Sequence, residues 1–485
     1  MDNPFYRNRA ELYSPAEVLE IYCPMPVMVP LAQPRNQVLY GGPGTGKSIV
    51  LKRLAYSAVR KNSNIPGPHP FFGVYVNCQR ELAFLNPVCD ATQSERVRSH
   101  IPNIEERMHA FMSHYISLTM ACLVCREITE GEDFSGQKEE WAARLASGIA
   151  ELCGLGVAYR GGLANLQADL DKKRASLRAH VANQTMFSED VGDTCTLRDV
   201  AVFSEGLAQI ISEHLKEFEN GNWKIYFLLD QYDSFQEVTQ RALNCLLRRG
   251  ASFQVKASVR PYALYTLDCP DGTQLTPGDD FDTVYLAHTS EKEDDYATLM
   301  DEITAKMMRT LTGISCILEM TKPEPTSKTD FRTLCRLSGG LTRNFLELCA
   351  LAVDFAQKED VDWQHQGFSE SFLTSATVIL ARRELERVSC IKGLPGPQVR
   401  WLVDGLCRRL RREGGTTLSP QIRVRTGMLF ENELSAELTR VLKKAFEHGA
   451  LRFISVKDCS LLTLPMQFVV NPVFFPRYNM PIGRV

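Results

Sequence analysis

The chain has 485 residues, a length typical of about three domains, and its 44% hydrophobic and 23% charged residues are ordinary for a soluble globular protein. It contains no apolar run of about 18 residues and no basic, apolar leader, so we expect no membrane span, no secretion and a cytoplasmic location. The net charge of −3 is unevenly spread, because residues 391–485 hold 15 Lys and Arg against 7 Asp and Glu. This basic end predicts contact with something anionic.

The 15 cysteines show no regular spacing, which indicates reduced, mostly buried thiols. Cys122 and Cys125 make the one CxxC pair, inside an apolar helical stretch between Phe111 and Ile128. A zinc site of this kind needs a second pair, and the sequence has none. We therefore expect these two side chains to pack in the core.

The first predicted helix begins near Ser14. Ser14 suits the N-cap, Pro15 suits the first helical position, and Glu17 can close a capping box. We expect this short helix to pack beside the site that follows in the chain. The alternative is a solvated N-terminal arm.

A phosphate-binding loop comes next. Residues 37–40 read as a short apolar strand, and 49–56 have apolar residues at helical spacing. A glycine-rich loop between strand and helix turns backbone N–H groups toward an anion, and the helix N-terminus adds partial positive charge. Lys47 can reach the β- and γ-phosphates, and Ser48 can ligate Mg²⁺. The predicted nucleotide site consists of Gly41, Gly42, Pro43, Gly44, Thr45, Gly46, Lys47 and Ser48.

A second strand is predicted at 71–77, and almost no strand signal lies between 91 and 218. Four sections there have helical periodicity: 104–130, 138–152, 161–182 and 197–218. The third carries an apolar stripe at Leu163, Leu166, Leu170 and Leu177. Such a stripe favours packing against the body of the protein, with an exposed interaction surface as the alternative.

An apolar strand at 224–229 ends in Asp230, and open α/β sheets place their ligand sites at that end of their strands. We therefore predict that Asp230 lies beside the phosphate loop and serves Mg²⁺. A helix at 236–249 and strands at 251–260 and 281–287 follow. Strands separated by helices imply a mostly parallel sheet covered on both faces.

From residue 292 to about 390 the pattern is again helical. Gly339 and Gly340 end one predicted helix, and Arg343 stands near the start of the next. An arginine at that place can reach back to a bound nucleotide. An ordinary surface arginine after a turn is the alternative.

The basic end combines helices at 397–411 and 434–448 with strands at 451–456 and 461–475, which is compatible with a winged helix. Its candidate DNA-binding side chains are Arg408, Arg409, Arg411, Arg412, Arg440, Lys443 and Lys444. The alternative is a solvated basic face without a ligand, because acidic residues share the region.

The order of these motifs resembles the AAA+ ATPases of the initiator branch, the origin-recognition-complex-like and cell-division-control-like proteins. The resemblance rests on GGPGTGKS at 41–48, LLDQYD at 228–233, SGGLTRNFLEL at 338–348, NPF at 3–5 and RAE at 9–11. The chain is similar in particular to prokaryotic members of that branch that are associated with defence and mobile-element loci.

The resemblance implies an α/β P-loop NTPase fold with a parallel sheet in the order 5-1-4-3-2, a helical insertion, an α-helical lid and a C-terminal winged-helix-like domain. The implied boundaries are 1–290 for the core with its insertion at about 91–218, 291–392 for the lid and 393–485 for the basic domain. The implied cofactors are ATP and Mg²⁺, and the implied activity is ATP hydrolysis. The roles carried over are phosphate and Mg²⁺ binding for Lys47 and Ser48, Walker B aspartate for Asp230, and lid (sensor 2) arginine for Arg343.

Two further roles are implied near the end of the strand at 253–259. For the sensor 1 position we choose Ser258 over Arg260. An arginine finger that acts on a neighbouring subunit could be Arg249 or Arg260, and the choice between them stays open.

One position departs from the family pattern. The family usually has Glu directly after the Walker B aspartate, where it orients the attacking water, and this chain has Gln231. An amide can orient water but cannot accept its proton. Asp233, two positions further on, could substitute. Because phosphoryl transfer depends mainly on positioning and electrostatic stabilisation, we expect slow turnover.

Three functions stay open at this point. The first is an ATP-dependent switch that couples nucleotide state to homo-oligomer assembly and to DNA or partner engagement, with antiphage defence suggested by the resemblance. The second is a DNA-binding initiator or loader in which ATP is secondary. The third is a signalling (STAND-like) NTPase that senses a partner through the helical insertion and activates a separate effector chain.

Overall fold

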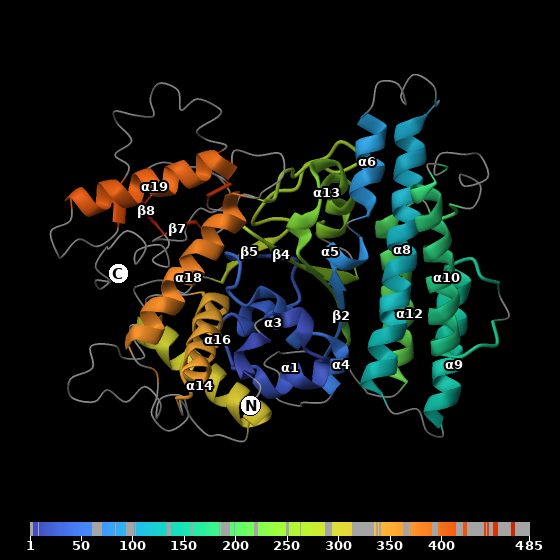
Figure 1. Ribbon diagram of the computed structural model, residues 1–485. Coiled ribbons are helices and arrows are strands. Elements are labelled where there is room, and N and C mark those ends of the chain that lie inside the picture. Colours follow the sequence, from blue (N-terminus) through green and yellow to red (C-terminus); the bar gives the residue numbers. More distant parts are fainter. Residues whose placement is uncertain are drawn as a thin grey trace.

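The structure is a computed structural model, in which the chain runs from the N-terminal segment through a central sheet to a basic end (Figure 1). It describes residues 3–7, 9–60, 70–82, 84–93, 101, 103–132, 137–156, 159–183, 185, 195–197, 199–217, 222–248, 252–261, 263–286, 293–312, 334–335, 338, 341–361, 368, 370–389, 396–413, 421–423, 441–442, 444–445, 450–453 and 467–470.

The central sheet has five parallel strands: β1 (Gln37–Tyr40), β2 (Phe71–Asn77), β3 (Lys224–Asp230), β4 (Phe253–Val259) and β5 (Asp282–Tyr285). Their order is β2-β3-β4-β1-β5, which confirms the expected order 5-1-4-3-2. All neighbouring pairs are parallel, so the carboxyl ends of the strands lie at one edge of the sheet. There Asn77 pairs in register with Asp230.

Both faces of the sheet are covered, as expected for buried parallel strands. On β3, Phe227 and Leu229 belong to a core cluster shared with the insertion helices. Tyr226 and Leu228, which alternate with them, belong to a second cluster shared with Val50 of the helix after the phosphate loop. The helices on this second side are α2 (Met28–Leu31) and α3 (Lys47–Arg53). α4 (Tyr56–Arg60) contacts both clusters, because Tyr56 belongs to the first and Val59 packs against the second.

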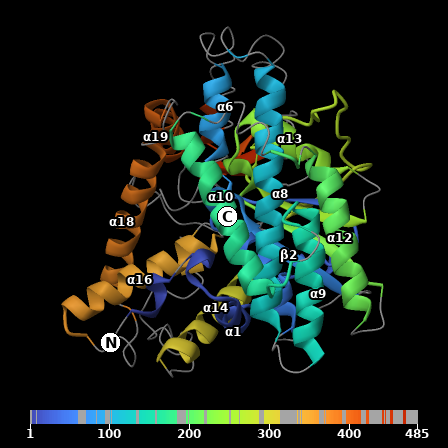
Figure 2. The same ribbon diagram turned by 90° about the vertical axis from the view of Figure 1, so that its right-hand side faces the viewer.

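The region between β2 and β3 forms a group of helices beside the sheet (Figures 1 and 2). These are α5 (Cys78–Glu81), α6 (Leu85–Gln93), α8 (Ile104–Gly131), α9 (Gln137–Leu152), α10 (Leu163–Ala182) and α12 (Val200–Lys216). The four predicted helical sections are therefore confirmed as α8, α9, α10 and α12. The leucine stripe of α10 is buried, which confirms that it packs against the body.

α8 is the one described helix that is long and apolar enough to cross a membrane. In its most apolar 18 residues 83% are buried inside the fold, and α8 contacts β2, α4 and α10. One such helix is weak evidence for a membrane, and its place in the core accounts for its composition. Cys122 and Cys125 lie on α8 and are buried there, as expected.

The chain before the phosphate loop forms the short 3₁₀ helices η1 (Pro4–Tyr6) and η2 (Ala10–Leu12) and the helix α1 (Pro15–Ile21). Ser14 caps α1, and Glu17 completes the predicted capping box. After β3 come η3 (Tyr232–Ser234), α13 (Glu237–Asn244) and η4 (Cys245–Leu247), which lead into β4.

The lid region consists of α14 (Glu293–Thr312), α16 (Thr342–Lys358) and α18 (Glu370–Ser389). These helices share a core cluster with the N-terminal segment, in which Phe5, Phe345 and Met300 are fully buried. The N-terminal segment and the lid are therefore packed together, although more than 270 residues separate them in the sequence.

The basic end contains α19 (Gly396–Glu413) and a small antiparallel sheet in the order β6-β8-β7. The strands are β6 (Gln421–Arg423), β7 (Leu451–Phe453) and β8 (Gln467–Val470). A helix followed by a three-stranded antiparallel sheet is compatible with a winged helix, which stays a prediction. Most of the predicted 434–448 helix lies outside the described residues, and the three domain boundaries stay predictions as well.

Candidate nucleotide-binding site

The loop after β1 has the backbone that a phosphate-binding loop requires. Gly44 has φ +82° and Gly46 has φ +96°, a left-handed conformation that favours glycine. A Cβ added at Gly41 would lie 2.6 Å from Thr45 Oγ1 and 2.9 Å from the carbonyl oxygen of Leu286. α3 begins at Lys47, and the N–H groups of its first turn have no partners inside the helix, which suits an anion.

Lys47 lies against its own loop. Its Nζ donates hydrogen bonds to the carbonyl oxygens of Gly41 at 2.6 Å and Gly42 at 3.0 Å. Burial lowers the pKa of Lys47 to about 8, and the carboxylates of Asp233 and Asp230 oppose this shift. A phosphate would offer Lys47 a charged partner, and charge-assisted hydrogen bonds are stronger than bonds to neutral carbonyls.

Asp230 is fully buried at the end of β3, and both of its carboxylate oxygens are held. Oδ2 accepts a hydrogen bond from the Tyr75 hydroxyl at 2.7 Å. Oδ1 accepts from Ser258 Oγ at 2.6 Å and from the Gln231 N–H at 3.0 Å. A carboxylate offers about four lone-pair sites, so Asp230 keeps capacity for a cation beside Ser48.

Gln231 and Asp233 follow Asp230 on a tight turn. Gln231 has φ +58°, which is uncommon for a residue other than glycine. The Asp233 carboxylate accepts a hydrogen bond from Arg260 Nε and forms an ion pair with it. The Asp233 side chain is 5% exposed and that of Arg260 is 25% exposed. The proposed substitute base is thus neutralised by a side chain of the same subunit.

The lid reaches the phosphate loop directly. The backbone N–H of Arg343, in the first turn of α16, donates to the carbonyl oxygen of Gly44 at 3.2 Å. A Cβ added at Gly44 would lie 2.7 Å from the Cβ of Arg343. Arg343 therefore lies at the phosphate loop, as its place at a helix start predicted.

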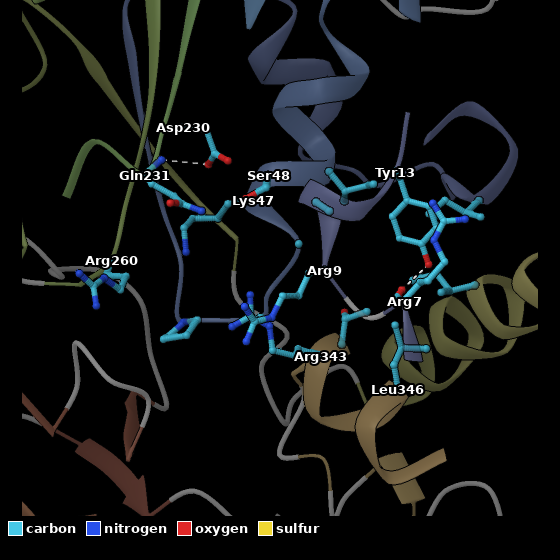
Figure 3. Close-up of a pocket in the computed structure, with 18 of the residues that line it drawn as sticks. Arg7, Arg9, Tyr13, Lys47, Ser48, Asp230, Gln231, Arg260, Arg343 and Leu346 are labelled. Atoms are coloured by element: carbon cyan, nitrogen blue, oxygen red, sulfur yellow. Dashed lines mark hydrogen bonds between the residues drawn. The ribbon is translucent and has the colours of Figure 1, made fainter. Parts of the chain in front are cut away.

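One cavity of about 590 Å³ lies at this site (Figure 3). Its polar lining includes Lys47, Ser48, Asp230, Gln231, Asp233, Arg260 and Arg343. Lys47, Asp230 and Gln231 lie on one side of it, and Tyr13, Arg7 and Leu346 on the other (Figure 3). The N-terminal segment and the lid add an apolar part that contains Ile21, Tyr22, Met25, Ile303 and Met307. A volume within the roughly 300–1,000 Å³ of small-molecule sites, with one charged and one apolar part, fits a nucleotide.

A family model of ORC-CDC6-like proteins matches residues 3–331 and 321–484 of the chain. The chain belongs to the ORC-CDC6-like family. No curated protein matches it. Two solved structures are similar to this ORC-CDC6-like protein. The Aeropyrum pernix ORC2 protein (ADPNP-ADP complexes) is 13% identical with a TM-score of 0.34, over 98% of this chain and 96% of that chain. Drosophila ORC bound to DNA is 11% identical with a TM-score of 0.28, over 97% and 93%.

The predicted P-loop, Asp230, Ser258 and Arg343 of this ORC-CDC6-like protein meet at one site. Arg260 lies at that site too, where it pairs with Asp233. Arg249, the other candidate finger, lies outside the described residues. Among the described residues no cluster of three or more His, Cys, Asp or Glu could hold a metal ion.

The candidate DNA-binding side chains are only partly described. Arg408 is exposed on α19. Arg409, Arg411 and Arg412 belong to the same helix, and their side chains lie outside the described part, as do Arg440 and Lys443. Lys444 Nζ lies 3.5 Å from the Tyr265 hydroxyl and 5.4 Å from the centre of that ring. Lys444 is therefore in contact with the core.

Sequence reasoning did not assign two side chains of the site. Tyr75 lies on β2, two residues before the end of the strand, and nothing near it in the sequence indicates a bond to Asp230. In the sequence Arg9 stands out only as part of a family motif, and in the structure it lines the cavity. Both are brought to the site by contacts between segments far apart in the chain.

Proposed function

We propose that this ORC-CDC6-like protein is an ATP-binding, slowly hydrolysing molecular switch of the cytoplasm. The nucleotide would bind between the phosphate loop and the lid. The observation that carries the proposal is that Arg343 touches Gly44 and lines the same cavity as Lys47. A ligand can shift an equilibrium between two conformations only through contacts that differ between them. The contact between Arg343 and Gly44 can supply such a difference.

The residues present fit ATP and Mg²⁺. The loop N–H groups, Lys47 and Arg343 would hold the phosphates, and the apolar part of the cavity would take the base. Ser48 and Asp230 would hold Mg²⁺, which supplies charge neutralisation to the phosphates. Tyr75 and Ser258 hold the Asp230 carboxylate by hydrogen bonds to its two oxygens. The carboxylate is therefore already oriented, and binding the cation costs little conformational entropy.

Slow turnover follows from the residues around the attacking position. Gln231 cannot accept a proton, and Asp233 is held by Arg260. We infer that hydrolysis needs Asp233 to be released or a partner to complete the site. Such a site suits a protein whose nucleotide state lasts long enough to control assembly.

DNA or a partner protein is the proposed target of the switch. The relatives support this: one solved relative is an origin recognition complex bound to DNA. On α19 the exposed side chains include Arg400, Trp401 and Arg408, which offer charge for phosphates and a ring for stacking. Homo-oligomer assembly and a role in antiphage defence belong to the same proposal.

A signalling NTPase held inactive by its lid is the second candidate. The direct bond from Arg343 to Gly44 favours it, because a lid that lies on the phosphate loop can block exchange of the nucleotide. In that case an effector chain would carry the response. The helical insertion does not suit a detachable sensor, because α8 is a core helix.

The test compares the wild type with Lys47→Ala and Arg343→Ala by ATP titration and size-exclusion chromatography. We expect Lys47→Ala to lose ATP binding and nucleotide-dependent assembly. Arg343→Ala should keep part of the ATP affinity and lose assembly. Unchanged elution profiles of the wild type with and without ATP would contradict a switch that acts through assembly. A rise in ATP affinity with duplex DNA, together with a DNA affinity that falls steeply with salt, would support DNA as the target.

A further inference from the structure

The N-terminal segment crosses from the lid to the helix of the phosphate loop. We name its described residues, 3–7 and 9–13, the strap. At its first end Asn3 Nδ2 donates to the carbonyl oxygen of Ala350 at 2.7 Å and to Asp354 Oδ1 at 2.9 Å, both on α16. The Tyr6 hydroxyl donates to the same Asp354 oxygen at 2.7 Å. Together with the buried ring of Phe5, these bonds fasten the strap to the lid.

The second end of the strap is fastened to the core. Lys52 Nζ donates to the carbonyl oxygens of Ala10 at 2.7 Å and Tyr13 at 3.1 Å. Lys52 lies on α3, the helix that begins with Lys47. Lid and phosphate loop are therefore connected through the strap, in addition to the direct bond between Arg343 and Gly44.

Arg9 lies between these two ends and lines the cavity with Lys47 and Arg343 (Figure 3). It is the N-cap residue of η2, next to Ala10, whose carbonyl Lys52 holds. Its backbone is thus fixed while its side chain is exposed at the cavity.

The cavity is cationic: six Lys and Arg line it against two Asp. Most of these cations have a partner of their own in the chain. Arg7 pairs with Glu17 at 2.6 Å, Arg260 with Asp233, and Arg387 with Glu384. Lys47 bonds to its loop carbonyls. Among the described residues the Arg9 side chain has no hydrogen-bond or ion-pair partner.

We propose that Arg9 binds the phosphates of the nucleotide from within the same subunit. This inference rests on the proposed ATP site. An arginine with a fixed backbone and no partner in the chain can donate two hydrogen bonds to a phosphate. Moving its guanidinium group out of water costs little free energy, because this group is weakly hydrated. Because Arg9 belongs to the strap, the bound phosphates are then linked to α16 at one end and to α3 at the other.

The test measures dissociation constants for ATP and for adenosine by calorimetry in the wild type, Arg9→Ala and Arg9→Lys. A charged hydrogen bond of this kind predicts about 10-fold to 100-fold weaker ATP binding in Arg9→Ala. Adenosine, which has no phosphate, should bind as in the wild type. Arg9→Lys keeps the charge without the planar fork, so its ATP affinity should lie between the two.

Arg35→Ala is the matched control. Arg35 is also exposed, 71% at its side chain, and its ion pair with Asp282 lies away from the cavity. The ATP affinity of Arg35→Ala should equal that of the wild type. Arg9→Ala should also unfold at the wild-type temperature without nucleotide, because its side chain has no partner to lose.

The outcomes separate the two claims. If the wild type and Arg35→Ala bind ATP and Arg9→Ala binds it equally well, Arg9 is no phosphate ligand while the ATP site stands. If Arg9→Ala weakens adenosine as much as ATP, Arg9 acts only through the shape of the strap and the inference is wrong. If the wild type binds no ATP, the proposed function itself fails.

Discussion

The backbone N–H of Arg343 donates a hydrogen bond to the carbonyl oxygen of Gly44, across 299 residues of sequence. This bond joins the first turn of a lid helix to the middle of the phosphate loop. A helix N-terminus carries partial positive charge, so α16 and α3 direct two such ends at one loop. A ligand that moves the Gly44 carbonyl would therefore change this bond to the lid.

The close contact between Gly44 and Arg343 predicts that Gly44→Ala is more damaging than its backbone conformation alone requires. A matched control is Gly272→Ala, since Gly272 has φ +81° and an added Cβ there meets nothing within 4 Å. Both variants carry the cost of a left-handed alanine, about 1–2 kcal/mol. Gly44→Ala should lose about 1–3 kcal/mol more in denaturant unfolding, because its Cβ collides with that of Arg343. Equal losses of unfolding free energy in the two variants would show that the lid moves away from Gly44 without cost.

Gln231 predicts a gain of function. Gln231→Glu keeps the shape of the side chain and supplies the proton acceptor that the family usually has. We expect ATP turnover to rise about 10-fold or more, since general bases contribute about 10²–10⁴-fold. The dissociation constant for ATP should stay near the wild-type value. The measurement is steady-state phosphate release, and unchanged turnover would show that another step limits the rate.

The ion pair between Arg260 and Asp233 predicts a non-additive double mutant. Arg260→Ala leaves the buried Asp233 carboxylate without its partner and should cost about 2 kcal/mol in unfolding free energy, allowing for the partial exposure of Arg260. Arg260→Ala with Asp233→Ala should cost less than the sum of the two single variants. Additive losses would mean that the pair contributes nothing in solution.

A second buried carboxylate predicts a pH dependence. Glu127 of α8 accepts hydrogen bonds from the Ser57 N–H at 3.1 Å, from Ser57 Oγ at 2.7 Å and from the Tyr75 N–H at 3.3 Å. Burial raises the pKa of Glu127 from 4.5 to about 7, and these bonds oppose the shift. The folded state therefore binds more protons than the unfolded state between these pH values, and the contribution of Glu127 to stability falls as pH rises.

Glu127→Gln removes the ionisable group and with it this pH-dependent contribution to stability. The unfolding free energy of the wild type relative to Glu127→Gln should fall by up to about 3 kcal/mol between pH 4.5 and pH 7.5. Glu106→Gln, on the exposed side of the same helix, is the control and should show no comparable trend. If the unfolding free energies of the wild type and Glu127→Gln differ by a constant amount across this pH range, the pKa of Glu127 is not raised in the folded state.

Local patterns in the sequence predicted the parts of the site that depend on neighbours in the chain. The capping box of Ser14 and Glu17, the loop at Gly44 and Gly46, and the helix start at Arg343 each need only a few residues to specify their geometry. The parallel strand order came from the resemblance, and the register of β2 against β3 confirms the place of Asp230.

Contacts between distant segments were not predictable in this way. The Tyr75 hydroxyl reaches Asp230 across 155 residues, and Arg9 enters the cavity because Asn3 and Lys52 hold the strap at its two ends. The partnership of Asp233 with Arg260 depends on where β3 and β4 end relative to one another. Each of these depends on tertiary packing, which no short stretch of sequence specifies.

The most direct measurement of the central claim is hydrogen–deuterium exchange of α16 in the protein with no nucleotide, with ADP and with a non-hydrolysable ATP analogue. If the nucleotide sets the position of the lid through Gly44 and Arg343, the amides at the start of α16 will change protection between the ADP and ATP-analogue states, and Lys47→Ala will abolish the change. If the analogue binds and the exchange of α16 equals that with ADP, the position of the lid does not depend on which nucleotide is bound. The proposal of a nucleotide-dependent switch is then wrong.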